Sequence, residues 1–160
     1  MIADVLTPRG TILQGTLTLM QNLVEDWSVH PFMIQLARAI VSKAGAKTPQ
    51  EETKAICSWT RRMIDYRRDP VGAEWVQDPL ETIINAKAGD CDDLSVVCGT
   101  LLQALGHPCM MVSVQWIGRD TFTHAVCLDK LTEKVVDAVS PIFDPWPPPG
   151  YQVQNMMEAK

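Results

Sequence analysis

A cysteine at the start of a predicted helix is the residue in this sequence that is best suited to covalent chemistry. Cys91 directly follows Gly89 and Asp90, and an apolar helical stripe then runs as far as Gly106. The first N–H groups of a helix are unpaired and carry partial positive charge, which favours a thiolate and can lower a cysteine pKa from about 8.5 toward neutrality. The same N–H groups could hold an oxyanion during acyl transfer. The position predicts a nucleophile.

Three aspartates surround this cysteine, and their effects oppose one another. Asp90, Asp92 and Asp93 stabilise the start of a helix through its dipole, but negative charge this close also opposes formation of a thiolate. The sequence leaves that conflict open. The acids lack the alternating carboxylates, glycine and distal glutamate of a calcium loop. The cysteines include no C-x₂-C pair of the kind that holds structural zinc, so we expect no metal site.

One of three histidines is expected to exchange protons with Cys91. His30 precedes a predicted helix and His107 lies in a turn, whereas His124 lies within a predicted strand, a rigid platform that can present an imidazole to a helix end. The next strand contains Asp137 among valines and an alanine. An aspartate there is costly unless it is paired, and adjacent strands would place it beside His124. Each residue alone is typical of a protein interior, but together they predict a nucleophile, a base and an orienting carboxylate.

This order of residues resembles the transglutaminase-like superfamily. The segments that carry the resemblance are Gly89-Asp90-Cys91-Asp92-Asp93, Ala104-Leu105-Gly106-His107, His124-Ala125-Val126 and Val136-Asp137. The resemblance extends to the sequence that precedes the cysteine. The residues there that resemble the family are Trp59, Arg61, Tyr66 and the run from Asp69 to Pro79. The resemblance covers roughly residues 50–140, and arguably the N-terminal helices as well.

The resemblance implies a papain-like core in which the cysteine helix packs on an antiparallel sheet. It implies that Cys91 is the nucleophile, His124 the general base and acid, and Asp137 the orienting carboxylate of an acyl-transfer enzyme that works through a thioester. The acyl acceptor is either water, in amide or peptide hydrolysis, or an amine, in transamidation. The candidates for lining the cleft or assisting the oxyanion are Trp75, Gln77 and Asp92. The strand before Asp137 lacks the aromatic residue often seen there in the family.

Helices are expected to make up the first part of the chain. Apolar residues at a spacing of three or four predict one helix over 10–27 and a second from Pro31 to Gly45. Thr48-Pro49-Gln50-Glu51 is a capping box that opens a third helix. The far end of that helix is basic, with Arg61, Arg62, Arg67 and Arg68, which suits a helix C-terminus. A short helix over Leu80–Asn85 and the cysteine helix over 91–105 follow.

Strands are expected to follow these helices. Short β-branched segments at 110–116, 121–128 and 134–139 predict an antiparallel sheet, and the proline-rich run 144–150 predicts an extended tail. Helices followed by strands predict a single α+β domain. Its parts are a helical N-terminal region packed on the core (1–47), a transglutaminase-like core (48–140) and a proline-rich C-terminal tail (141–160).

Composition excludes several classes of function. The chain has 160 residues, with 14 Lys and Arg against 19 Asp and Glu, and its net charge of −5 argues against broad binding to nucleic acid phosphates. No apolar run approaches the roughly 18 residues that span a bilayer, and the N-terminus with Asp4 is unlike a signal peptide. We expect reduced cysteines, no cofactor, no membrane insertion, and a place in the cytoplasm of a host cell or in a virion.

Two functions from different classes fit these observations. The first is the cysteine enzyme, whose partner is a protein or peptide substrate. Small stand-alone family members with the same Asp-Pro-Val-Gly-X-Glu approach are similar to proteins of tailed bacteriophages and prophages. The alternative is therefore a weakly active or inactive structural protein of a phage particle, which docks on other phage proteins through the N-terminal helices, with Trp27, and the proline-rich tail. The intact set Cys91, His124 and Asp137 favours the enzyme.

Overall fold

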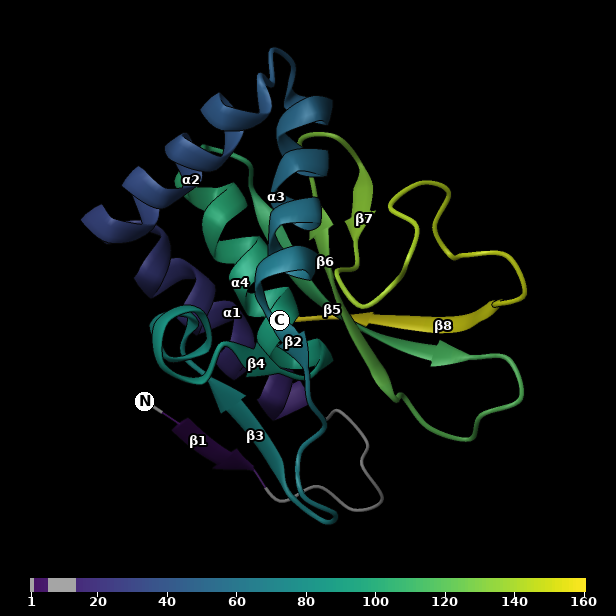
Figure 1. Cartoon of the computed structure of the whole chain (residues 1–160). Coiled ribbons are helices and arrows are strands. Elements are labelled where there is room, and N and C mark those ends of the chain that lie inside the picture. Colours follow the sequence, from purple (N-terminus) through teal and green to yellow (C-terminus); the bar gives the residue numbers. More distant parts are fainter. Residues whose placement is uncertain (1, 6–13) are drawn as a thin grey trace.

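The computed structural model describes residues 2–5 and 14–160, and shows helices packed on one face of a four-stranded sheet (Figure 1). The helices are α1 (Gln14–Ser28), α2 (Pro31–Ala44), α3 (Pro49–Met63), the short π-helical η2 (Glu81–Ala86) and α4 (Cys91–Ala104). The sheet is antiparallel in the order β7 (Lys134–Val136), β6 (His124–Asp129), β5 (Cys109–Trp116) and β8 (Val153–Glu158). Two small pairs join β1 (Ile2–Val5) to β3 (Glu74–Gln77) and β2 (Asp65–Tyr66) to β4 (Ala88–Gly89). This is the predicted α+β class.

Local signals account for the ends of α2 and α3. The Nδ1 atom of His30 accepts a hydrogen bond from the N–H of Phe32, and Gly45 ends α2 in the left-handed conformation with φ of 69°. The predicted capping box of α3 is confirmed, because Thr48 and Glu51 cap each other's backbone N–H groups. None of the described helices is both long and apolar enough to cross a membrane.

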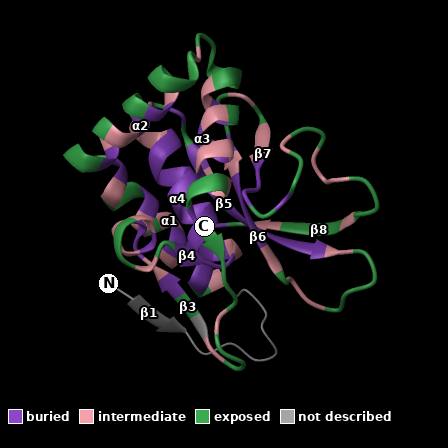
Figure 2. Ribbon diagram, viewed as in Figure 1, coloured by how far each residue is buried: buried purple, intermediate pink, exposed green. Residues whose placement is uncertain are grey.

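α4 occupies the centre of the molecule and is buried along almost its whole length (Figure 2). Helices α1, α2 and α3 contact α4, and so do strands β5 and β6 of the sheet. The largest fully buried apolar side chains come from the four α-helices and β5 and are Leu17, Met20, Met33, Ile56, Leu94, Leu101, Leu102 and Met111. The hydroxyl of Ser95 donates to the carbonyl of Ala125 at 3.0 Å, which fixes the first turns of α4 against the start of β6.

The structure differs from the sequence-based expectation at two strands. The predicted strand 134–139 ends at Val136, because Oδ1 of Asp137 accepts hydrogen bonds from the N–H groups of Val139 and Ser140 and turns the chain. The expectation that the chain after Pro141 is an extended tail misses β8, which pairs with β5. The half-exposed β8 carries glutamine, asparagine and methionine in place of alternating β-branched residues, so its strand signal is weak.

The face of the sheet opposite α4 carries a second apolar cluster. Val112, Val114 and Val126 are fully buried there, and Trp146 and Val153 pack against them. The proline-rich run is therefore not a free extension. It returns to the sheet and covers a face that would otherwise be exposed to water.

A buried histidine joins α3 to the sheet. Nδ1 of His107 lies 2.9 Å from Oδ2 of Asp129, and its Nε2 lies 2.8 Å from Oε2 of Glu52. These carboxylates raise the pKa of His107 above its ordinary value of 6.5, against the effect of burial. Asp129 also accepts hydrogen bonds from Thr53 and Thr132. Although burial acts in the opposite direction, these bonds and His107 lower the pKa of Asp129 from 3.8 to about 2.

The cluster predicts how stability depends on pH. The charged form of His107 contributes stability that is fully present below 6.5 and is lost as the pH rises through its raised pKa. Asp129 contributes stability that is present above 3.8 and is lost as the pH falls toward about 2. We expect the advantage of the wild type over His107→Gln, measured by urea unfolding, to decline from about pH 6.5 upward. Parallel pH profiles for the two proteins would contradict this.

Candidate active site

The N-terminus of α4 is held by two reciprocal aspartates. Oδ1 of Asp90 accepts from the N–H of Asp92, and Oδ2 of Asp93 accepts from the N–H of Asp90, both at 3.1 Å. Gly89 leaves room for this cap, because a Cβ atom there would lie 2.5 Å from the Cβ of Asp93. Close packing against Asp93 therefore explains why a glycine precedes Asp90 and Cys91. This order places Cys91 at the first position of α4.

Gln77 of β3 also bonds to this cap. Its backbone N–H donates to Oδ1 of Asp93 at 2.8 Å, and its Nε2 donates to Oδ2 of Asp93 at 2.9 Å and to the carbonyl of Ala88 at 3.1 Å. Both side-chain hydrogens are therefore in use. Gln77 positions α4, and the expectation that it assists an oxyanion does not agree with this geometry.

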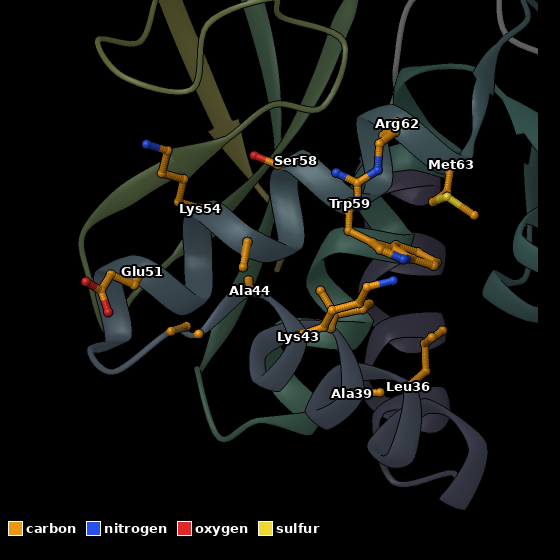
Figure 3. Close-up of a pocket in the computed structure, with 14 residues that line it drawn as sticks. Leu36, Ala39, Lys43, Ala44, Glu51, Lys54, Ser58, Trp59, Arg62 and Met63 are labelled. Carbon is orange, nitrogen blue, oxygen red and sulfur yellow. The ribbon is translucent and has the colours of Figure 1, made fainter.

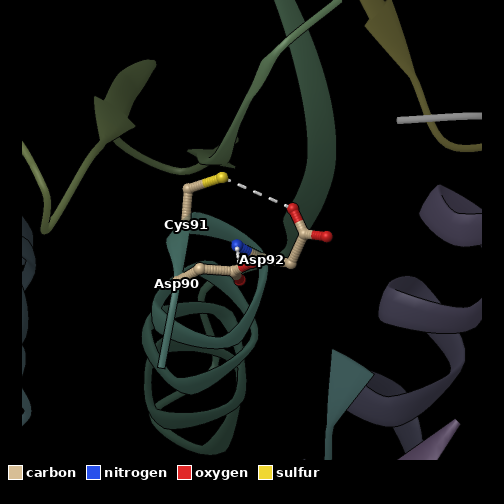
Figure 4. A group of neighbouring side chains, drawn as sticks. All are labelled: Asp90, Cys91 and Asp92. Carbon is tan, nitrogen blue, oxygen red and sulfur yellow. Dashed lines mark hydrogen bonds between the residues drawn. The ribbon is translucent and has the colours of Figure 1, made fainter. Parts of the chain in front are cut away.

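Cys91 is half-buried, whereas the other four cysteines are buried. Its S–H donates to Oδ1 of Asp92 at 3.5 Å (Figure 4). Burial, followed by the charges of Asp92 and Asp90, raises the pKa of the Cys91 thiol well above 9.0, while a backbone hydrogen bond from Ala125 acts in the other direction. The direction of this shift is opposite to the lowered pKa that the helix start alone favours.

His124 and Asp137 lie in direct contact. Nε2 of His124 is 2.7 Å from Oδ2 of Asp137, and the adjacent residue, Ala125, provides the N–H that bonds to Cys91. Burial raises the pKa of Asp137, but the hydrogen bond and the charge of His124 outweigh it and hold this pKa below 3.8. With Nε2 bonded to Asp137, Nδ1 is the ring nitrogen of His124 left to exchange a proton.

A cluster of three aromatic residues that were not singled out as site residues contacts His124 through Trp116. Trp116 stacks on its ring at a centroid distance of 5.6 Å, and Trp116 in turn contacts Trp146 at 5.8 Å and Tyr151 at 5.4 Å. Nε1 of Trp146 donates to Oδ2 of Asp137 at 3.1 Å. No local pattern indicates these contacts, because the tail brings Trp146 and Tyr151 back to the sheet.

A cleft of about 790 Å³ opens above Cys91. Its floor is residues 90–92, and its walls are the segment 68–73 and the β5–β6 hairpin. Asp92, expected at the cleft, lines it, whereas Trp75, also expected there, is not among the lining residues. The backbone N–H of Trp75 donates a hydrogen bond to the carboxylate of Asp69, which lies in the wall of the cleft.

A group of possible metal ligands occurs at the same floor. One ligand atom each from Asp90, Cys91 and Asp92 lie within 4.8 Å of one another (Figure 4). Asp90 already accepts the helix-capping hydrogen bond, and Asp92 accepts the thiol hydrogen. The carboxylate of Asp90 therefore caps the helix, and the carboxylate of Asp92 binds the thiol.

The fold and site define a papain-like arrangement, with a cysteine at a helix start, a histidine on the adjoining sheet and a carboxylate directly after the neighbouring strand. The sequence profile of the transglutaminase-like superfamily matches residues 34–142, and the chain belongs to that superfamily. No curated protein sequence matches the chain.

Two solved structures share the fold. A protein from Parabacteroides distasonis, provisionally named a protease, has a TM-score of 0.54 and 14% identity over 77% of this chain and 26% of that one. A protein from Cytophaga hutchinsonii, provisionally named a cysteine protease, has a TM-score of 0.50 and 15% identity over 79% of this chain and 50% of that one. The chain thus spans about a quarter and a half of their lengths. Neither comparison bears on a resemblance to phage proteins, which stays a prediction.

The environment of Cys91 predicts its reactivity. We expect iodoacetamide to modify Cys91 before the four buried cysteines, at a rate that still increases above pH 9. Asp92→Asn removes the nearest negative charge and should lower the thiol pKa, raising the rate near neutral pH by about tenfold per pKa unit. Asp26→Asn, a change on exposed α1 surface, is the control. Peptide mass spectrometry that finds Cys57 or Cys98 modified first would contradict the assignment.

The hydrogen bond from Trp146 predicts a positioning role. Trp146→Phe keeps an aromatic ring beside Trp116 but removes the donor to Asp137. We expect the rate of modification of Cys91 by a peptidyl electrophile to fall roughly three- to tenfold with little change in thermal stability. Trp27→Phe, a tryptophan on α1 that packs against the core far along the chain from the site, should leave the rate unchanged. Equal losses of stability in both variants, with an unchanged rate, would show that Trp146 only packs.

Proposed function

We propose that this protein is a cysteine-dependent acyl-transfer enzyme that cleaves an amide or peptide bond through a thioester on Cys91. The observation that carries the proposal is the 2.7 Å contact of His124 with Asp137, on a strand whose next residue bonds to the accessible cysteine. Membership of the transglutaminase-like superfamily supports the same class of chemistry.

The first half-reaction transfers the acyl group to sulfur. As a substrate carbonyl reaches Cys91, the thiol proton moves to Nδ1 of His124, and the sulfur attacks the carbonyl carbon. Backbone N–H groups in the first turn of α4 stabilise the oxyanion. His124 then gives its proton to the leaving amine as the C–N bond breaks, and the thioester remains. Asp137 keeps the imidazole oriented and stabilises its charged form.

The second half-reaction releases the acyl group. His124 takes a proton from the incoming water or amine, which attacks the thioester, and returns that proton to the sulfur as the C–S bond breaks. Water gives a carboxylic acid and an amine gives a new amide. Because burial and then the acids at the cleft floor raise the pKa of Cys91, we expect the thiol to give up its proton to His124 only when a substrate is in place.

The experiment is labelling of Cys91 by a peptide vinyl sulfone. His124→Gln should slow labelling by roughly 10²–10⁴-fold, and Cys91→Ala should abolish it. His30→Asn is the matched control, since His30 is an exposed helix cap that asparagine can replace. Rapid labelling of another cysteine, or a rate unchanged in a folded His124→Gln variant, would support the non-catalytic structural protein.

A second measurement distinguishes the acyl acceptors. A glutamine-containing peptide is incubated with the protein in the presence and absence of a fluorescent primary amine. Incorporation of the amine, lost in Cys91→Ala, indicates transamidation. Hydrolysed peptide without incorporation indicates an amidase or peptidase.

A further inference from the structure

A second concave surface lies between α2 and α3, and it shares no lining residue with the cleft at Cys91. Its volume is about 890 Å³. We call it the α2–α3 groove; small residues line part of it, namely Ala39, Ala44, Gly45, Ala46, Ala55 and Ser58. Figure 3 shows the ring of Trp59 lying between the two helices, with Leu36 on the side of α2 and Met63 at the end of α3. Met63 is 52% exposed, so much of its apolar side chain is in contact with water.

The groove is basic, although the protein as a whole is acidic. Lys43, Lys54 and Arg62 line it, and within the described residues none of the three has an ion-pair or hydrogen-bond partner. The single acid in the lining, Glu51, uses its carboxylate to accept the backbone N–H groups of Lys47 and Thr48. In a chain of net charge −5, this surface therefore carries a local excess of positive charge.

We propose that the α2–α3 groove binds an acidic amphipathic helix of a partner protein. Lys43, Lys54 and Arg62 would pair with its carboxylates, while its apolar stripe would cover Trp59 and Met63. The helices that form the groove have 14 and 15 residues, so the groove extends about 20 Å and accommodates three to four helical turns. The small lining residues permit the close approach that helix packing requires.

Three observations favour a protein helix over other anionic partners. A phosphate backbone offers nothing apolar for Leu36, Trp59 and Met63 to contact, and the net charge of −5 opposes broad binding to a polyanion. Three cations are also fewer than the polybasic clusters that recognise anionic lipids. Because the groove and the catalytic cleft are separate, this proposal stands or falls independently of the proposed enzyme activity.

The probe is a designed capped peptide of about 18 residues, with leucines at helical spacing and glutamates on both flanks. Its twin has lysine in place of every glutamate. We expect the acidic peptide to bind the full chain with a Kd at or below about 100 μM, and to shift the NMR signals of α2, α3 and the Trp59 indole. The triple variant Lys43→Glu, Lys54→Glu, Arg62→Glu should weaken binding at least about tenfold. Arg38→Glu, on α2 but outside the groove, should leave the affinity unchanged.

Each of four results would overturn the proposal. They are no binding at about 1 mM peptide, equal binding of the lysine twin, shifts located outside the groove, and an affinity unchanged by the triple variant. Phosphatidylserine vesicles and a single-stranded oligonucleotide are tested in parallel. If either binds through the groove while the peptide does not, the surface recognises lipid or nucleic acid, and the protein-helix proposal is wrong.

Discussion

The buried carboxylate of Asp93 is the interaction on which the geometry of the site depends. It accepts hydrogen bonds from the N–H of Asp90 and from the backbone and side chain of Gln77, so one group joins β3 to the first turn of α4. Burial nevertheless raises its pKa to about 6. Gly89 is the residue that allows the chain to approach this carboxylate closely. Any shift of Asp93 would move the start of the helix that carries the cysteine.

A second buried carboxylate, Asp137, has the opposite electrostatic character. Both aspartates are nearly inaccessible to water, yet the pKa of Asp93 is raised and that of Asp137 is lowered. The difference lies in their partners, because Asp93 is bonded by neutral amides whereas Asp137 contacts His124, which can carry a positive charge. Asp93 thus acts as a structural anchor, and Asp137, whose pKa is held below 3.8, carries negative charge beside the imidazole near neutral pH.

The C-terminal segment completes both the sheet and the surroundings of this pair. β8 extends the sheet beside β5, and Trp146 both packs on the second apolar cluster and donates to Asp137. The C-terminal segment, which the sequence predicts to be an extended tail, therefore helps to hold Asp137 in place. The α2–α3 groove shares no lining residue with the cleft, although both of its helices pack on α4.

The sequence by itself determined the features that depend on neighbours along the chain. The caps of α2, α3 and α4 are set by residues within a few positions, and β6 and β7 are joined by a short turn, so the proximity of His124 to Asp137 follows from their order. Only the tertiary structure decided the raised pKa of Cys91, the role of Gln77, the contact of Trp146 and the pairing of β8. These depend on burial and on contacts between distant segments. The burial of single polar groups and contacts between distant segments leave no periodic pattern in the sequence, which is why local signals could not reveal them.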